Sequence, residues 1–302
     1  MPHKDVQEKL KLSYNALEDN EKQMFLDIAC FFIGADKRIA TYTWKDLQLY
    51  PNSGLARMIE LLLIKIDSLN LLRMHDQLRD LGRAIACSEN TEPLYWSRPW
   101  DEETMKVLRR KEKNENIRAL RLSERGSREF INQKSFTRMP NLKFLHLRDV
   151  GFVGDFEGSL SELRWLKLER CPDSFEATNV HLEKLVTLDL SSEPLSKNYI
   201  SENWRGWSSI KMKRLKVLDL SYCSRLKSTP NLSPFTNLEM LILNYCNCLE
   251  EIHPSIVDVK RLVSLNLSMC CVLRQIPSSI EKLGELVELD LYLQVLRNCP
   301  NP

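Results

Sequence analysis

The sequence LKVLDLSYC, from Leu215 to Cys223, has leucines at its first, fourth and sixth positions and a cysteine at its ninth. The same leucine spacing occurs six more times, and a degenerate copy begins at Ile117. The six other copies start at Leu142, Leu163, Leu185, Leu238, Leu262 and Leu286. Successive fourth positions are separated by 25, 21, 22, 30, 23, 24 and 24 residues. Repeats of roughly 20 to 29 residues with this pattern predict a solenoid of leucine-rich repeats.

The leucines also predict how each copy contributes to the solenoid. In an extended LxL segment the leucines point inward and their neighbours point outward, so stacked copies share one core. The strands of successive copies then form a parallel β-sheet on the concave face. The long interval between Leu190 and Leu215 predicts an insertion near residues 192–212, which we expect to bulge as a loop carrying Trp204 and Trp207. Residues 117–302 are therefore predicted to form about eight repeats.

The chain has nine cysteines, and neither CxxC pairs nor Cys/His runs with zinc spacing occur. Four cysteines occupy the ninth position of a repeat copy: Cys171, Cys223, Cys246 and Cys270. Leucine-rich repeats place Asn or Cys at this position, where an inward thiol can donate to a backbone carbonyl of a neighbouring copy. We therefore expect reduced, buried structural thiols, no metal site, and an intracellular location in the cytoplasm or nucleus.

The first 90 residues lack the repeat and carry helical patterns instead. Apolar residues recur at helical spacing in four segments, residues 6–17, 24–32, 55–63 and 78–85. Two short extended segments, residues 63–66 and 71–74, are joined by a polar turn. Helices with a small β-wing predict a winged-helix domain over residues 1–90, and residues 91–116 are interpreted as a connector. The predicted fold class is α+β, a small mostly helical domain followed by the solenoid.

The stretch LLRMHDQLRDLG, Leu71 to Gly82, contains a triplet that helix formation alone does not require: Met74, His75 and Asp76. The triplet lies where the second extended segment turns into a helix, and unpaired N–H groups at a helix start favour an anion. Asp76 is expected to cap these N–H groups and to hold the ring of His75 in place. The structural interpretation is a helix cap beside a surface ring, and the functional interpretation is one wall of a diphosphate site.

Two further segments accompany the repeats, FLDIACFFIG (Phe25 to Gly34) and LLRMHDQLRDLGR (Leu71 to Arg83). With the repeats they resemble plant intracellular immune receptors of the TIR nucleotide-binding leucine-rich-repeat class. FLDIACFF resembles the hydrophobic motif of that class's winged-helix subdomain, and the triplet at residues 74–76 resembles its MHD motif. The resemblance implies that His75, flanked by Met74 and Asp76, approaches the β-phosphate of ADP in the intact receptor and helps to hold it inactive.

The sequence departs from that class because it lacks a phosphate-binding loop. No GxxxxGK[ST] occurs, and the chain has nine glycines in all. We therefore interpret the chain as a receptor fragment, from a gene fragment, an incomplete gene prediction or a pseudogene. It is expected to have no enzyme activity and no cofactor of its own, whereas the resemblance implies ADP and ATP for the intact receptor. Oligomerisation is expected only where the full receptor is present.

The outward residues of the repeat strands are the candidates for binding a protein partner. Seven of them are singled out: Phe144, His146, Arg148, Trp165, Lys167, Asp189 and Asp219. Phe144 and Trp165 are expected to be adjacent, exposed rings. The cations of Arg148 and Lys167 rim them, which is the composition of interface hot spots. The expected partner is a pathogen effector or the receptor's own domains, and packing against the winged-helix domain or the connector is an equal alternative.

Charge and motif content argue against other function classes. The chain has 43 basic and 41 acidic residues, and residues 1–90 carry 12 basic against 13 acidic, which does not favour nucleic acid or an anionic membrane. The longest apolar run, residues 58–66, is too short to span a bilayer. The five histidines are scattered without a GxSxG or HExxH motif, so catalysis is not predicted. The alternative function is a stand-alone leucine-rich-repeat adaptor with no nucleotide role.

Overall fold

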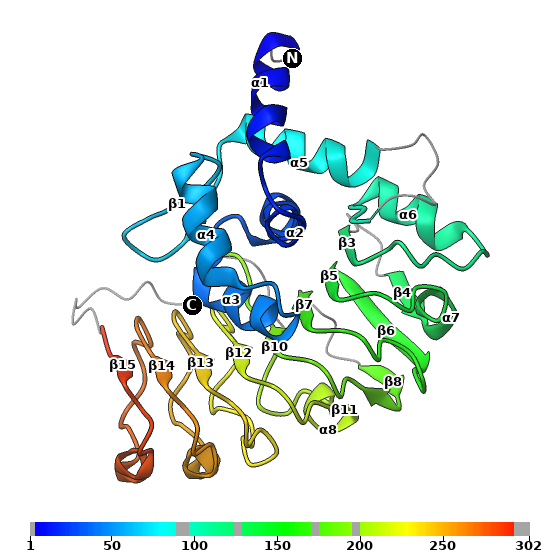
Figure 1. Cartoon of the computed structure of the whole chain (residues 1–302). Helices are drawn as coiled ribbons and strands as arrows, with labels where there is room; N and C mark the ends of the chain where they lie inside the picture. Colours follow the sequence, from blue (N-terminus) through cyan, green and yellow to red (C-terminus); the bar gives the residue numbers. More distant parts are fainter. Residues whose placement is uncertain (1–3, 89–96, 124–128, 171–174, 195–199, 293–302) are drawn as a thin grey trace. The chain divides into compact units, whose positions relative to one another are not determined.

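The computed structural model describes residues 4–88, 97–123, 129–170, 175–194 and 200–292 (Figure 1). The chain divides into two compact units. The winged-helix unit comprises residues 1–110 and 116–120, and the repeat unit comprises residues 111–115 and 121–302. The first unit includes a helix, α6 (Glu102–Arg109), inside the segment that the sequence predicts to be a connector.

The winged-helix unit consists of helices and one small antiparallel hairpin. The helices are α1 (Lys4–Asn15), α2 (Asp19–Asp27), the π-helical η1 (Ile28–Phe32), α3 (Lys37–Asp46), α4 (Pro51–Glu60), α5 (Asp76–Ser88) and α6. Strands β1 (Lys65–Ile66) and β2 (Leu72–Arg73) pair antiparallel and form the wing. The helices and wing confirm the predicted winged-helix arrangement, with an additional helix, α3, between residues 37 and 46.

The segment FLDIACFF forms the centre of this unit because nearly every side chain in it is buried. A capping box starts α2, in which the side chain of Glu18 accepts from the backbone N–H of Glu21 and the side chain of Glu21 accepts from the backbone N–H of Glu18. Glycines let other helices approach α2 and η1 closely. A Cβ on Gly82 of α5 would lie 2.6 Å from Cβ of Ala29, which cannot move without its own backbone. Any side chain at position 82 would therefore push α5 away from η1.

One polar cluster lies within this otherwise apolar core. The carboxylate of Asp27 accepts from the indole N–H of Trp44 at 2.9 Å and from Nε of Arg98 at 2.8 Å. Arg98 also donates to the side chain of Gln23 at 2.8 Å. Asp27 and Arg98 are each 1% exposed, so both charges are removed from water and each compensates the other.

The repeat unit contains one eight-stranded sheet. Its order is β3 (Ala119–Ser123), β5 (Phe144–Arg148), β7 (Trp165–Glu169), β10 (Thr187–Asp189), β12 (Val217–Asp219), β13 (Met240–Ile242), β14 (Ser264–Asn266) and β15 (Glu288–Asp290). From β5 to β15 the neighbours are parallel, and the middle leucine of each copy is in register with that of the next, as in Leu218 beside Leu241. The predicted parallel ladder is confirmed.

Shorter elements connect these strands. A second sheet has the order β4 (Glu129–Asn132), β6 (Val150–Asp155), β8 (Glu176–Thr178), and a third joins β9 (Val180–His181) to β11 (Ile210–Lys211). The short helices are α7 (Gln133–Phe136), α8 (Gly206–Ser209), and the 3₁₀ helices η3 (Pro254–Asp258) and η4 (Ser278–Lys282). The predicted insertion does not simply bulge. Trp204 is 4% exposed and packs edge-on against Phe175 at 5.4 Å between centroids, because an aromatic cluster continues into this segment.

The repeat cysteines behave largely as the sequence predicts. The thiols of Cys223, Cys246 and Cys270 are buried and donate to the carbonyls of the preceding copy, at Leu190, Leu220 and Leu243, over 3.6, 3.1 and 3.0 Å. Cys171 lies outside the described residues. Cys271 is disulfide-bonded, which departs from the expectation that all nine cysteines are reduced.

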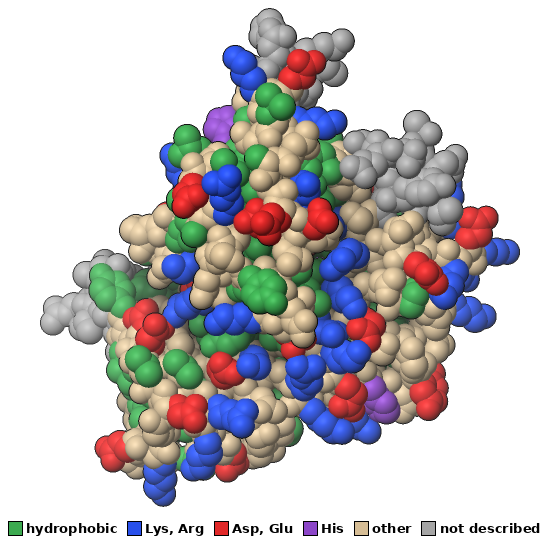
Figure 2. All heavy atoms as spheres, in the orientation of Figure 1, with side chains coloured by type: hydrophobic (Ala, Val, Ile, Leu, Met, Phe, Trp, Pro, Cys, Tyr) green, Lys and Arg blue, Asp and Glu red, His purple; other side chains and the backbone are tan. Residues whose placement is uncertain are grey.

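Two properties of the described part of the chain bear on function. None of the helices in it combines the length and the apolar character needed to cross a membrane. Within the same residues, no group of three or more His, Cys, Asp or Glu side chains is arranged to hold a metal ion. Figure 2 shows basic and acidic side chains interspersed over the visible surface.

Candidate functional site

The wing places His75 at the start of α5. The carboxylate of Asp67 accepts from the backbone N–H groups of Leu69 and Leu71, both at 2.9 Å, and from Nε of Arg73 at 2.8 Å. The hydrogen bond from Leu71, followed by those from Arg73 and Leu69, holds the pKa of Asp67 below its usual value. A charged carboxylate therefore fixes the turn between β1 and β2. The same turn sets the direction in which the chain passes from β2 into α5.

His75 itself caps α5. Its Nδ1 accepts from the backbone N–H of Gln77 at 3.2 Å, and its carbonyl accepts from the N–H groups of Leu78 and Arg79 at 2.9 and 3.0 Å. These contacts make His75 the residue at the N-cap, a position where a side-chain acceptor satisfies an unpaired helix N–H. The ring is exposed and Met74 before it is half-buried.

The expected roles of His75 and Asp76 are therefore different in the structure. The sequence predicts Asp76 as the cap, but it is the first residue of α5, and its exposed carboxylate pairs with Nη1 of Arg79 at 2.6 Å. Because Asp76 already has helical geometry, its side chain lies beside the helix and the residue before it is positioned to cap. The imidazole of His75 supplies the cap. Capping preferences do not predict this, because His is not among the residues that are preferred at the N-cap.

This cap determines what the ring can do chemically. An imidazole nitrogen that accepts a hydrogen bond carries no proton, so in the neutral ring the proton lies on Nε2. The exposed Nε2–H is then a single directional donor at the positive end of a helix dipole. Such a donor suits an anionic oxygen, in keeping with the functional interpretation of the triplet.

On the repeat sheet, the predicted exposed rings are buried. Phe144 is 0% and Trp165 is 2% exposed. The two residues are register partners on β5 and β7, and their rings pack at 6.4 Å between centroids, with the ring of His146 edge-on to Trp165 at 6.1 Å. The prediction of an exposed aromatic hot spot is therefore wrong, since these large side chains pack within the chain.

The polar candidates on the same strands form a chain of charged contacts, which we call the strand ladder. It is built from His146 and Arg148 on β5, Lys167 and Glu169 on β7, Asp189 on β10 with Ser191 and Glu193 after it, and Asp219 on β12 with Ser221 after it. Glu169 contacts Nε2 of His146 at 3.1 Å and Nη1 of Arg148 at 3.7 Å. Lys167 reaches Asp189 and Ser191, both at 3.0 Å. Arg148 also binds Glu193 through two hydrogen bonds, at 3.0 and 2.7 Å.

Burial and charge determine the protonation of the strand ladder. Burial lowers the pKa of His146, although its hydrogen bond with Glu169 opposes the shift. Burial favours the neutral form of Lys167, but the charge of Asp189, its hydrogen bond with the lysine and the charges of Asp219 and Glu169 together outweigh burial and raise the pKa of the lysine. Burial, followed by the charge of Asp189, raises the pKa of Asp219 to about 7. The ladder thus holds a cation between two carboxyl groups, one of which is protonated in part at neutral pH.

Asp189 and Asp219 also have a local structural role. Asp219 accepts from the backbone N–H of Ser221 at 2.9 Å and from its hydroxyl at 2.5 Å, and Asp189 holds Ser191 in the same way. These bonds form the turn that ends each strand. Glu169 and Glu193 are members of the ladder that the sequence did not single out. For Glu169 the signal was an acid at the register position of Arg148 on the neighbouring strand, whereas Glu193 lies beyond the end of β10 and gave no such signal.

Comparison with known proteins shows which proteins this chain is similar to. Residues 18–90, which include the FLDIACFF segment and His75, match the winged-helix domain of Roq1-like disease resistance proteins. The chain is 29% identical to disease resistance protein RUN1 of Vitis rotundifolia, over 86% of this chain and 21% of that protein. It is 30% identical to disease resistance protein RPV1 of the same plant, over 86% of this chain and 20% of that protein. Over most of its length the chain is similar to plant disease resistance proteins.

Within the disease resistance family the match is broad but partial. A third relative, SUPPRESSOR OF npr1-1, CONSTITUTIVE 1 of Arabidopsis thaliana, is 32% identical over 87% of this chain and 18% of that protein. The chain thus spans about a fifth of the length of these relatives. Among solved structures, the leucine-rich repeat domain of the type III effector XopL is similar at 15% identity, with a TM-score of 0.39 and 96% of each chain covered.

Proposed function

We propose that the chain forms the winged-helix and leucine-rich-repeat portion of a plant immune receptor that acts in the cytoplasm or nucleus. In this proposal the winged-helix unit senses whether a nucleotide-binding domain holds ADP or ATP, and the repeats recognise a partner or restrain the switch. The chain has no catalytic role of its own and holds a nucleotide only together with that domain. The match of residues 18–90 to a resistance-protein winged helix supports this proposal.

The single observation that carries the nucleotide role is the cap made by His75. Because Nδ1 accepts from Gln77 at 3.2 Å, the ring is held in one orientation and its donor edge is at Nε2. His75 is exposed, so a phosphate oxygen brought by another domain has access to that edge. Met74 and Asp76 flank the ring, and the pairing of Asp76 with Arg79 reduces the negative charge that a phosphate would meet.

Isothermal titration with ADP tests this proposal. The chain is mixed with the nucleotide-binding domain of a relative such as RPV1, and ADP is titrated into each component and into the mixture. We expect tighter ADP binding in the mixture, and we expect His75→Ala to remove the gain. His75→Ser retains a capping hydroxyl but is too short to donate from the position of Nε2, so it should also remove the gain while keeping the helix start.

A matched control is available in the repeat unit. Nδ1 of His253 accepts from the backbone N–H of Ser255 at 3.2 Å, which is the same capping contact at the start of η3. His253→Ala should leave ADP binding unchanged. If the chain adds nothing to ADP affinity, or if His75→Ala and His253→Ala have equal effects, the nucleotide role is wrong and the adaptor function, with no nucleotide role, gains support.

We propose that the strand ladder forms the part of the receptor that contacts a protein partner, either an effector or the nucleotide-binding domain. Arg148 supports this because its side chain is 21% exposed and its partner Glu193 is 59% exposed, so an acidic group of a partner can replace Glu193. Lys167, His146, Asp189 and Asp219 continue the ladder, and Phe144 and Trp165 support it from within. Arg148→Glu is expected to weaken co-elution with the nucleotide-binding domain in gel filtration, whereas Arg205→Glu, an exposed residue of the insertion, should not.

A further inference from the structure

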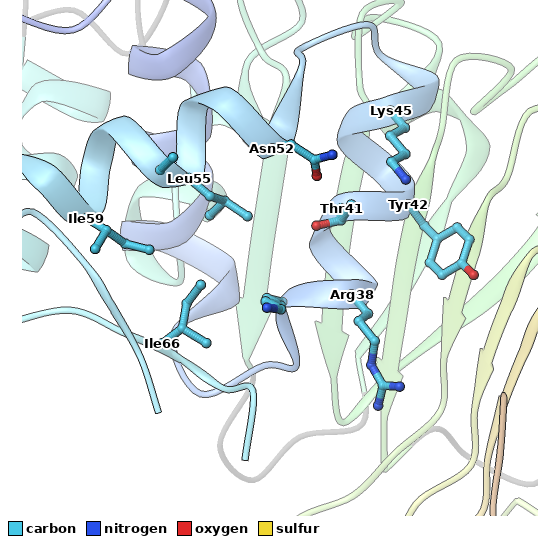
Figure 3. Close-up of a pocket in the computed structure, with 10 residues that line it drawn as sticks. Arg38, Thr41, Tyr42, Lys45, Asn52, Leu55, Ile59 and Ile66 are labelled. Carbon is cyan, nitrogen blue, oxygen red and sulfur yellow. The ribbon is translucent and has the colours of Figure 1, made fainter. Parts of the chain in front are cut away.

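A groove lies between α3 and α4 of the winged-helix unit, and His75 is not among the residues that line it (Figure 3). Its volume is about 450 Å³, within the range of protein sites that hold ligands or side chains of a partner. All ten lining residues come from α3, α4 and β1, which belong to the same compact unit. The groove is therefore a feature of this unit alone.

The floor of the groove is aliphatic. Leu55, Ala56 and Ile59 lie along one side of α4, and Ile66 of β1 closes the end. Leu55 is buried, whereas Ala56 is exposed and Ile59 is 39% exposed. An exposed isoleucine next to a concave apolar surface favours an occupant that brings aliphatic groups.

The rim of the groove is cationic. Lys37 and Lys45 are two helical turns apart on the same face of α3, and neither forms an ion pair within the described residues. The third cation, Arg38, is held by Asp36: Nε and Nη2 of the guanidinium both donate to Oδ2 of the carboxylate, at 2.9 and 2.7 Å. None of the lining residues is acidic. The two ammonium groups are thus unpaired within the described residues and favour an occupant that carries carboxylates.

Polar groups face each other across the middle of the groove. In Figure 3 the hydroxyl of Thr41 on α3 and the carboxamide of Asn52 on α4 both project into the space between the helices. A hydroxyl and a carboxamide together supply donors and acceptors that match a peptide backbone. A purely aliphatic ligand would leave these groups without partners.

We propose that this groove binds a short acidic peptide segment of a partner protein, with the sequence pattern acidic, any, aliphatic, any, acidic in an extended conformation. Eight residues of α-helix separate Lys37 from Lys45, a rise of about 12 Å. Four residues of extended chain cover about 13 Å, and alternate side chains point the same way. The two acidic residues then meet the two lysines, and the aliphatic residue between them enters the floor at Leu55 and Ile59. This inference does not depend on the proposed nucleotide role.

Fluorescence anisotropy with the full chain tests the groove. The probe is a fluorescein-labelled peptide containing Glu-Ser-Leu-Ser-Glu, and the comparison peptides carry Lys in place of Glu, or Ser in place of Leu. We expect binding of the first peptide that weakens as salt is raised, and at least about tenfold weaker binding of each comparison peptide.

Variants locate the binding on the protein. Lys37→Glu with Lys45→Glu should weaken binding by at least about tenfold, because two attractive contacts become repulsive. Ala56→Trp should abolish binding by filling the floor. The matched control is Lys9→Glu with Lys11→Glu, which changes the same number of exposed lysines on α1 and should leave binding unchanged.

Three outcomes would overturn the proposal. Equal binding of the acidic and the lysine peptides would show that charge complementarity plays no part. Equal loss in the α1 control and the groove variants would place binding elsewhere. Absence of peptide binding, together with changed hydrogen exchange in the repeat unit of the Lys37→Glu, Lys45→Glu variant, would show that the chain's own repeats occupy the groove.

Discussion

The ammonium group of Lys167 lies 3.0 Å from the carboxylate of Asp189, its register partner on the next strand. The charges of Asp189 and Asp219 both act on Lys167, while the charge of Asp189 disfavours the ionised form of Asp219. The ammonium group of Lys167 is therefore shared, as the positive charge, by two buried carboxyl groups. The consequence is that Asp219 keeps its proton to a much higher pH than an ordinary aspartate.

Stability of the repeat unit should respond to pH through Asp219. An aspartate carboxyl in water has a pKa of 3.8, whereas the pKa of Asp219 in the folded chain is about 7. Between these values the folded state binds more protons than the unfolded state, so the contribution of Asp219 to the free energy of unfolding falls as pH rises. Asp219→Asn should therefore stabilise the chain more at pH 7 than at pH 5, as measured by urea unfolding at both values.

Asparagine is a suitable replacement because Asn266 makes the same turn with the N–H of Ser268 at 2.9 Å. Asp290→Asn is the control, since Asp290 holds the N–H of Tyr292 at 3.0 Å but is exposed. His146 acts in the opposite direction because its pKa is lowered, but it is common to parent and variant and cancels in the difference. An equal benefit of Asp219→Asn at both pH values would contradict the prediction.

Loss of the His75 cap should destabilise α5. His75→Ala leaves the N–H of Gln77 without its acceptor, at an expected cost of about 0.5 to 2 kcal/mol in the free energy of unfolding. His75→Asn, which can cap through its side-chain oxygen, should restore most of the loss. Urea unfolding followed by circular dichroism measures both. A stable alanine variant would mean that the ring makes no energetic contribution to the helix.

Removal of a repeat thiol should cost more than removal of its neighbour. Cys246→Ala deletes a fully buried side chain and its bond to the carbonyl of Leu220, so about 1 to 3 kcal/mol should be lost. Cys248→Ala, two residues away and half-buried, is the control and should change the free energy of unfolding by less than about 0.5 kcal/mol. Thermal unfolding of the two variants side by side tests the difference, and equal values would argue against an ordered role for the buried thiol.

Separating the buried ion pair should destabilise the winged-helix unit strongly. Asp27→Asn leaves the guanidinium of Arg98 buried without a counter-charge, at an expected cost of about 3 to 5 kcal/mol. Glu60→Gln removes the charge from the exposed pair of Glu60 with Arg57 and should cost less than about 1 kcal/mol. Urea unfolding midpoints distinguish the two. Similar small effects would indicate that Asp27 is not charged in the folded chain.

The features that could be predicted from the sequence are those in which the same local environment recurs in every repeat copy. The leucines at 145, 166, 188, 218, 241 and 265 all meet the same environment, so one pattern determined the strands, their register and the buried cysteines. The winged-helix motif was equally local. Contacts between distant residues left no such pattern. Asp27 and Arg98 are separated by 71 positions, and nothing near either one indicates its partner.

The candidate site was predicted less well for a different reason. The sequence identifies which residues point outward from a strand, but the exposure of Phe144 and Trp165 depends on what packs over them. At His75 the spacing identified the helix start correctly, whereas the choice between an imidazole and a carboxylate as the cap depends on which residue first adopts helical geometry. Both properties follow from three-dimensional geometry and not from residue type.

The cluster around Asp27 has a practical consequence for dissecting the chain. A polypeptide cut at residue 90, the predicted end of the winged-helix domain, would keep Asp27, Trp44 and Gln23 but lose Arg98. Its core would then contain a carboxylate that has lost its ion-pair partner. Shortened proteins that end at residue 120 retain the arginine and the whole winged-helix unit, residues 1–110 and 116–120, so the autonomous folding unit should be sought there.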